Sequence, residues 1–284
     1  MLDNRPKLAH CATNAIKNKP TARRFADSLP QLWMPEVFKY APFSWLASLF
    51  ALREIMNWPD YQWLNQDAKL SVAFVPQHCL DLQSLCYESF IATHSKVPTR
   101  QHNWHDFFNA LIWRQFPLSK SALNRLHMAD IKAHGTLQRT PRRNRITHFD
   151  ECGVLLVYSD PVIAQLLKDH QWLEAFWQHR SSWGKQVQAL IFGHANYEML
   201  LNPYIGLTGK WLGIQVPACY FDWPQWEQLR WVDQHLQHRL AQENCLGEKG
   251  VLSPLPLLGV PGWWSDNQQA DFYRNSDYFM PKRK

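Results

Sequence analysis

Residues 103–113 read Asn-Trp-His-Asp-Phe-Phe-Asn-Ala-Leu-Ile-Trp, and they combine the clearest helical pattern of the chain with its densest group of polar side chains. Asn103 is a favourable N-cap residue, and Asp106 follows three positions later, as in a capping box with Asp in the Glu/Gln position. At about 100° per residue, one apolar arc of this helix is formed by Trp104, Phe107, Phe108 and Leu111. The pattern predicts a helix that packs on the core.

The opposite side of this helix carries His105, Asp106, Asn109 and Trp113, where an exposed helix would carry Lys, Glu or Gln. We therefore expect protein or a cleft to cover this face as well. His105 and Asn109 are spaced i and i+4, so they can together contact a ligand, a metal or a reacting group. The plainer alternatives are that Asp106 only starts the helix and that His105 is a hydrogen-bonded structural histidine.

The length of 284 residues is sufficient for a sizeable core, and nothing in the sequence forces a division into two domains. Residues 1–24 are polar and basic, which predicts a poorly ordered N-terminal segment. We expect residues 25–284 to form a single globular domain. Residues 254–264 contain too many prolines and glycines for a regular element, so we expect them to form an extended cover over the surface.

Hydrophobic periodicity, capping residues and turn residues predict an α+β fold that is predominantly helical and has a small antiparallel β component. Glu151-Cys152-Gly153 lies between two short apolar runs and predicts the turn of a β-hairpin over residues 146–158. Helices are also expected to begin at Asp160-Pro161 and, with Asp222 as the cap, at Pro224. The other expected elements are helices over 43–55, 80–93, 119–134 (ended by Gly135) and 224–243, and strands over 70–75 and 210–216.

The net charge of +6 permits contact with phosphates without requiring it. Part of the basic excess lies in a predicted loop at 139–145, and nucleic acid is a possible partner through Arg142, Arg143 and Arg145. The six cysteines show no C-x-x-C spacing, which argues against a zinc ribbon and suits a reducing compartment. The sequence lacks a secretory signal and an apolar run long enough to span a bilayer. We therefore predict a cytoplasmic protein.

Three polar groups interrupt otherwise apolar segments: His105 with Asn109, His194 with Glu198, and His148 with Asp150 and Glu151. Burying such groups is costly unless they are paired. A His/Glu pair at i and i+4 can supply two metal ligands, or a general base that a carboxylate orients. The alternative is a hydrogen bond that joins helices, and acidic residues are also ordinary in hairpin turns. The sequence contains no G-x-S-x-G, P-loop, dinucleotide or H-E-x-x-H motif, which disfavours nucleotide and flavin cofactors.

Several stretches occur in the order typical of one family: Tyr87-Glu88, Val97–Arg100, Asn103–Trp113, Phe116–Lys120, Leu123-Asn124 through His127, Phe149–Gly153, Phe192–Ala195 with Glu198, and Leu258–Trp263. On these residues the chain resembles the bacterial family catalogued as domain of unknown function 3025. The resemblance implies no reaction. It does imply a set of polar residues within the matching stretches, comprising Glu88, Arg100, His105, Asp106, Asn109, Lys120, Asn124, His127, Asp150, Glu151, His194 and Glu198.

The leading hypothesis is a hydrolase-type enzyme whose catalytic groups are His105, Asn109, His127, His194 and Glu198. Of these, His105, His194 and Glu198 would bind a divalent metal or act as general acid and base. A small anionic substrate would contact Arg100, Lys120 and Asn124. The remaining polar residues would support the fold or hold the site residues in position, and they are Glu88, Asp106, Asp150 and Glu151. The alternatives are a nucleic-acid-associated protein and a non-catalytic interaction protein. The enzyme hypothesis requires His105 and His194 to lie within about 12 Å of each other.

Overall fold

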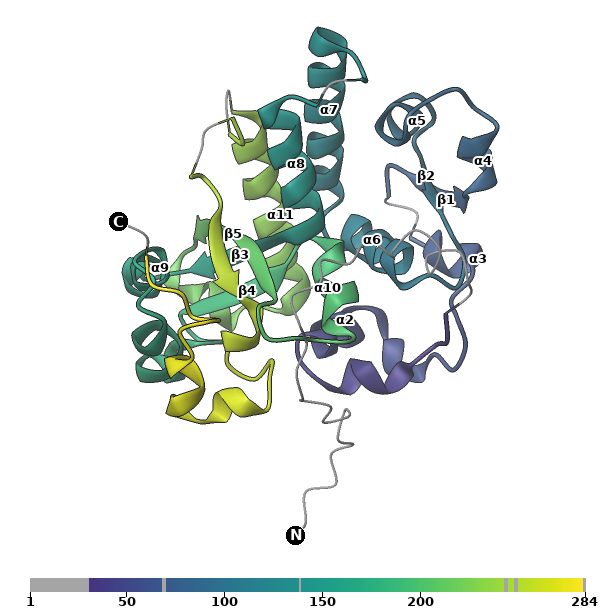
Figure 1. Ribbon diagram of the computed structural model, residues 1–284. Helices are drawn as coiled ribbons and strands as arrows, with labels where there is room; N and C mark the ends of the chain where they lie inside the picture. Colours follow the sequence, from purple (N-terminus) through teal and green to yellow (C-terminus); the bar gives the residue numbers. More distant parts are fainter. Residues whose placement is uncertain (1–30, 68–69, 138, 243–244, 248–249, 283–284) are drawn as a thin grey trace.

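The computed structural model describes residues 31–282, apart from 68–69, 138, 243–244 and 248–249 (Figure 1). The basic segment predicted at residues 1–24 lies outside these residues. Ten α-helices are present in the described part, and together with two small sheets they form an α+β fold, as predicted. These helices are α2 (Phe43–Phe50), α3 (Tyr61–Leu64), α4 (His78–Asp81), α5 (Tyr87–His94), α6 (Trp104–Gln115), α7 (Pro117–His134), α8 (Pro141–Cys152), α9 (Pro161–Lys168), α10 (His194–Leu200) and α11 (Gln225–Ala241).

The larger sheet has the strand order β4-β3-β5-β6. Its central strand β3 (Gly153–Tyr158) pairs antiparallel with β4 (Val187–Ile191) and parallel with β5 (Thr208–Gln215). β5 in turn pairs antiparallel with β6 (Ser253–Pro256). The smaller sheet is a parallel pair of β1 (Ala73–Pro76) and β2 (Lys96–Thr99). Because β3 is buried along nearly its whole length, its sequence is a continuous apolar run, as is usual for a strand covered on both faces.

Short segments of one turn or slightly more connect these elements. They are η1 (Pro35–Lys39), η2 (Leu52–Glu54), η3 (Glu174–Gln178), η4 (Arg180–Ser182), η5 (Ala218–Asp222), η6 (Leu257–Gly259), η7 (Asp266–Gln268) and η8 (Ala270–Arg274). No helix of the described residues combines the length and the apolar character that a membrane crossing requires.

Helix α6 lies inside the molecule, as its two predicted faces required. Asn103 caps it, since the Asn103 side chain accepts a hydrogen bond from the backbone N–H of Asp106 at 3.0 Å. Every residue of α6 except His105 and Arg114 is buried. On its apolar face Trp104 stacks between Trp33 and Phe108, with ring centroids 5.0 and 5.3 Å apart. Helices α7 and α10 pack against α6, and the candidate site lies on its polar side.

The predicted hairpin at 146–158 is wrong in its first half, because residues 141–152 form α8. Thr140 caps this helix by accepting a hydrogen bond from the N–H of Arg143 at 3.0 Å, and Pro141 occupies the first helical position. Ile146 and Phe149, spaced i and i+3, are buried on one side, which a strand would not allow. The basic stretch predicted as an exposed loop is therefore largely the first turns of a packed helix.

Other boundaries moved for local reasons. The helix predicted at 43–55 ends at Phe50, because Ala51 takes a left-handed conformation with φ of 51°. The helix predicted at 80–93 is divided into α4 and α5. Asp222 was expected to cap a helix beginning at Pro224, but it is the last residue of η5, and α11 begins at Gln225 without a side-chain cap. The segment 254–264 was expected to be irregular, but part of it forms β6 and η6, because β6 adds to the edge of β5 through its carbonyls and remaining N–H groups.

The remaining boundaries agree with the sequence predictions. α7 covers the helix predicted at 119–134 and ends at Gly135. Asp160 caps α9 by accepting a hydrogen bond from the N–H of Val162 at 2.9 Å, with Pro161 at the first helical position. β5 coincides with the strand predicted at 210–216 within two residues, and β1 overlaps the strand predicted at 70–75 over residues 73–75 and continues to Pro76.

Candidate functional site

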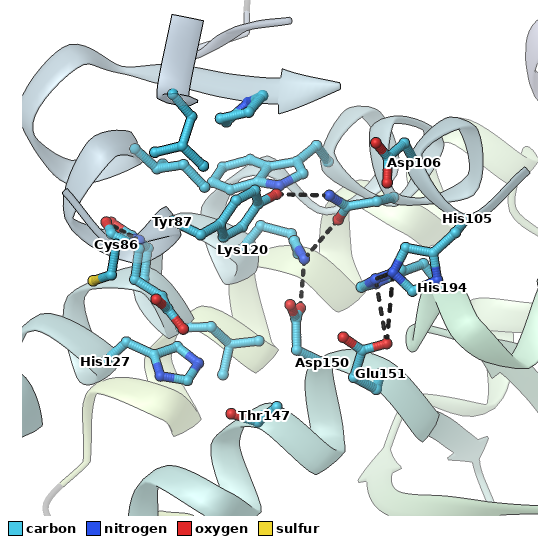
Figure 2. A pocket seen from close by; sticks show the side chains of 18 of the residues that line it. Cys86, Tyr87, His105, Asp106, Lys120, His127, Thr147, Asp150, Glu151 and His194 are labelled. Carbon is cyan, nitrogen blue, oxygen red and sulfur yellow. Dashed lines mark hydrogen bonds and ion pairs between the residues drawn. The ribbon is translucent and has the colours of Figure 1, made fainter. Parts of the chain in front are cut away.

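Three side chains from three helices meet at one end of a cavity: His105 of α6, Glu151 of α8 and His194 of α10 (Figure 2). The Nε2 atoms of His105 and His194 lie 3.0 Å apart. The Glu151 Oε2 atom lies 3.4 Å from Nε2 of His194 and 3.9 Å from Nε2 of His105. Ligands of a tetrahedral zinc ion stand about 3.3–3.6 Å apart, given bonds of about 2.0–2.2 Å. The three atoms therefore have the spacing of a metal-ligand set.

Glu198 contacts this cluster from the outer side of His105. Its Oε2 atom accepts a hydrogen bond from Nδ1 of His105 at 2.8 Å, so His105 directs its other nitrogen, Nε2, toward His194 and Glu151. A carboxylate on the outer nitrogen is a common way to fix the tautomer and orientation of a metal-binding histidine. From the sequence, Glu198 was expected to be a metal ligand, and Glu151 was expected to be structural or to hold the ligands in position. In the structure Glu151 belongs to the three-atom group, whereas Glu198 orients His105.

Two glycines bring Glu151 and His194 together. Gly153 ends α8 two residues after Glu151, and Gly193 immediately precedes His194; the Gly193 N–H donates to the Gly153 carbonyl at 2.8 Å. A Cβ atom on Gly193 would lie 2.3 Å from the backbone nitrogen of Gly153 and 2.4 Å from that of Cys152. Only glycine allows this approach of the end of α8 to the start of α10.

Replacing Gly193 by alanine is therefore expected to lower the free energy of unfolding by at least about 2 kcal/mol, since the backbone must move to relieve the overlap. The same movement should separate Glu151 from His194. Chemical denaturation measures the first effect. Gly213→Ala is the matched control, because the Cβ atom there would meet side-chain atoms of Tyr158 and Trp211 at 3.0 and 3.1 Å, which can yield. Equal destabilisation by the two substitutions would contradict the role given to Gly193.

A chain of hydrogen bonds runs beside the cluster (Figure 2). Asn109 donates to the Tyr87 hydroxyl at 2.9 Å and accepts from the Lys120 ammonium at 3.1 Å, and Lys120 forms an ion pair with Asp150. Burial acts to raise the pKa of the Asp150 carboxyl, but the charge of Lys120 outweighs it and the pKa is lowered overall. Asp150 is thus ionised. Asn109, predicted to act with His105 on a ligand, joins Tyr87 to Lys120 and lines the same cavity as His105.

The charges around the cluster favour a cation, and the pKa of each histidine depends on them. Burial and the charge of Lys120 lower the pKa of His194 well below its usual value, so His194 is neutral near pH 7, as a metal ligand must be. Burial also acts to lower the pKa of His105, but the hydrogen bond to Glu198 and the charges of Glu151 and Glu198 raise it overall. Burial raises the pKa of Glu151, against the effect of His105. Two carboxylates around two imidazoles attract a positive charge.

The cavity has a volume of about 780 Å³, which is in the range of ligand pockets. It extends from His105, Glu151 and His194 past Lys120 to His127 on α7 and to Arg143 and Thr147 on α8. His127 was a predicted site residue, and it lies in this cavity on the far side of Lys120 from the cluster (Figure 2). Sequence reasoning did not select Tyr87 or Thr147. Read as a helix, residues 141–152 would have shown Arg143, Thr147 and Glu151 on one face at i, i+4 and i+8.

Several predicted residues have other partners. The Arg100 side chain pairs with Asp106, with Nε–Oδ2 and Nη2–Oδ1 distances of 2.9 Å, and Asp106 also accepts the Arg100 backbone N–H at 2.6 Å. Asn124 donates to the backbone carbonyl of Glu88 at 2.9 Å, which ties α7 to α5. His148 lies near Lys210, and burial and the charge of Lys210 lower its pKa.

Of the three arginines considered for nucleic acid, one lies in the cavity and the other two lie near residues 245–247. Arg143 is buried and lines the cavity. Arg145 donates to the backbone carbonyls of Leu246 and Gly247, and the charge of Arg142 acts on Cys245. The structure therefore does not present them as one exposed basic surface. Nucleic-acid binding stays a prediction that no contact of the described residues supports.

Together these features define an α+β protein with a His/Glu/His cluster, a buried Lys–Asp pair and a polar cavity that joins them. The chain belongs to the family described as "Protein of unknown function (DUF3025)", whose model matches residues 72–283, as the sequence resemblance indicated. All residues of the cluster lie in the matched part. No curated protein and no solved structure was found to match the chain.

Proposed function

We propose that this protein is a divalent-metal-dependent enzyme of the hydrolase type, with His105, Glu151 and His194 as the metal ligands. One observation carries the proposal: a single ligand atom from each of the three residues lies within 4.8 Å of the other two, at the end of a cavity large enough for a substrate. Each residue comes from a different helix, so the arrangement is a product of tertiary packing and not of local helix geometry.

Three protein ligands, two histidines and one carboxylate, are the set that catalytic zinc sites use when they keep a fourth position for water. His105, Glu151 and His194 would hold the ion, and the chemistry that it would supply is the activation of water for attack on a carbonyl or phosphoryl group. Glu198 would hold His105 in the required tautomer. Lys120 would hold Asp150 ionised.

The rival explanation is an internal hydrogen-bond network without chemistry. The 3.0 Å separation of the two Nε2 atoms is also that of an N–H···N hydrogen bond between a protonated and a neutral imidazole. In that case substitutions at His105 would lower the melting temperature and would not change metal content. The two explanations therefore differ in metal binding and not in stability.

Metal analysis of protein purified without a His-tag tests the proposal. We expect about one divalent ion per chain, retained after dialysis or restored by titration with zinc, manganese or ferrous iron, as the three-ligand set implies. The metal found also distinguishes hydrolysis from oxygen chemistry, because two histidines and one carboxylate are likewise the ligands of non-haem iron. Failure to bind any of the three ions with a stoichiometry near one would overturn the proposal.

Replacing Glu198 by glutamine is expected to weaken metal binding by about 10–100-fold without abolishing it, the usual cost of altering a group behind a ligand histidine. The amide retains the size of the carboxylate but not its charge, so His105 is held in place less firmly as a ligand. Competition with a chromophoric chelator measures the affinity. Glu54→Gln, at an exposed position on η2, is the control and should leave the affinity unchanged. Complete loss of metal in Glu198→Gln would instead identify Glu198 as a ligand.

A further inference from the structure

We propose that the end of the cavity remote from the cluster binds the anionic group of the substrate, a carboxylate or a phosphate, through Arg143, Thr147 and His127. These three residues are called the distal pocket. The inference rests on the proposed function in one respect, since it takes the cluster as the place of reaction. It assigns anion binding to residues other than Arg100 and Lys120, which the sequence had suggested for that purpose.

The position of the distal pocket follows from the antiparallel packing of α7 and α8. Lys120 on α7 pairs with Asp150 on α8, and Thr140 donates to Asp130 at 2.7 Å near the other end of the two helices. His127 lies between these contacts on α7, and it therefore faces the part of α8 that carries Arg143 and Thr147. Arg143 precedes Glu151 by eight residues, which places them about 12 Å apart along the helix at about 1.5 Å per residue. The cavity is thus long enough for a substrate with two separated functional groups.

Unsatisfied hydrogen-bonding groups collect in the distal pocket. His127 is 6% exposed and Arg143 is 3% exposed. Within the described part of the chain, Nδ1 of His127, Nε of Arg143 and Oγ1 of Thr147 are buried and have no hydrogen-bond partner. All three residues line the cavity, and Figure 2 shows His127 and Thr147 on the same side of it. Buried polar atoms without partners are costly, and an oxyanion with several lone pairs would satisfy them.

The guanidinium of Arg143 is only partly used by the protein. One of its terminal nitrogens donates to the Thr136 carbonyl at 3.3 Å, and the other lies 3.9 Å from the carboxylate of Glu88, beyond hydrogen-bond distance. By contrast, Lys120 and Arg100 are in close ion pairs with Asp150 and Asp106. A planar guanidinium that keeps donors available is well suited to bidentate contact with a carboxylate or phosphate.

With a divalent ion at the cluster, the charge of the whole cavity would also favour an anion. The residues that line it include four Arg or Lys and four Asp or Glu. These charges balance, so a divalent ion at the cluster leaves an excess of positive charge for the substrate to neutralise. Arg139, exposed at the rim, adds to the attraction at the distal end.

Calorimetric titration of the full chain with inorganic phosphate and, separately, with acetate tests the inference. Each titration is carried out before and after metal removal with EDTA. We expect at least one of the two anions to bind in the absence of metal, and the stronger one shows which source of anionic oxygen the pocket favours. Arg143→Lys and Thr147→Val should each weaken that binding by about tenfold, the effect of one lost hydrogen bond to a charged group. His105→Ala, at the other end of the cavity, should leave it within about threefold, because the two sites share no contact.

Absence of binding by either anion to metal-free wild-type protein would overturn the inference. So would unchanged binding in both distal variants, or loss of binding in His105→Ala. Thr147→Val preserves side-chain size, so it remains informative if Arg143→Lys does not fold. Metal content measured on the same samples separates the two proposals. If the protein binds the anion but no stoichiometric metal, only the proposed metal enzyme is refuted. If it binds the metal but the distal variants bind the anion as tightly as the wild type does, only the distal pocket is refuted.

Discussion

A His194→Ala variant is expected to lose stoichiometric metal, with an affinity reduced by more than about 100-fold, since even the groups behind metal ligands contribute 10–100-fold. Of the three proposed ligands, His194 is the one whose surroundings best suit it to bind a metal. It is buried at the start of α10, its imidazole is held neutral by burial and by Lys120, and its Nε2 atom lies 3.0 Å from His105 and 3.4 Å from Glu151. No proton must therefore be removed from His194 before a metal binds.

Elemental analysis and zinc titration of the purified variant provide the measurement. His238→Ala is the matched control, because His238 is an exposed histidine on α11 and its loss should leave one metal per chain. Circular dichroism of both variants establishes whether they are folded. A folded His194→Ala protein that retains one tightly bound ion would place the metal elsewhere, and the proposed enzyme would then have to be abandoned.

Replacing Lys120 by alanine is expected to lower the free energy of unfolding by about 3 kcal/mol, the lower end of the range for breaking a buried ion pair. Lys120 is 3% exposed, and its ammonium contacts both Asp150 and Asn109. Without it the Asp150 carboxylate would remain in the interior without its main counter-charge. The loss is at the lower end because the Asp150 side chain keeps 22% of its surface open toward the cavity.

Urea denaturation of the variant measures this change, and Lys282→Ala is the appropriate comparison. Lys282 also pairs with an aspartate, Asp169, but both side chains are substantially exposed, at 58% and 38%. Exposed pairs contribute about 0–1 kcal/mol, so Lys282→Ala should have little effect. A double variant, Lys120→Met with Asp150→Asn, should recover much of the stability, because it removes both charges together. If Lys120→Ala were no more destabilising than Lys282→Ala, the buried pair would not be a main element of the site.

The secondary structure was predictable wherever local rules act alone. Asn103 caps α6, Asp160-Pro161 begins α9, and Gly135 ends α7, because capping depends on a few neighbouring residues. Residues 141–152 show where local rules fail. Their β-branched and aromatic residues, followed by Gly153, resemble a strand and a turn, but the Thr140 cap and the packing of Ile146 and Phe149 favour a helix. Gly153 is needed because a Cβ atom there would lie 2.3 Å from the Phe149 carbonyl oxygen, and not because a hairpin turn requires it.

The sequence alone predicted the α+β class, the two covered faces of α6, the family resemblance and the proximity of His105 to His194. Only the tertiary structure decided which carboxylate joins them. Glu198 is one helical turn from His194 and was the natural partner by spacing, yet it reaches the outer nitrogen of His105. Glu151, on a separate helix far from His194 in sequence, reaches the inner side because Gly153 and Gly193 let α8 and α10 touch. Spacing along a helix places residues on one face, but which side of a partner ring each one reaches depends on how separate helices pack, and that is a long-range property.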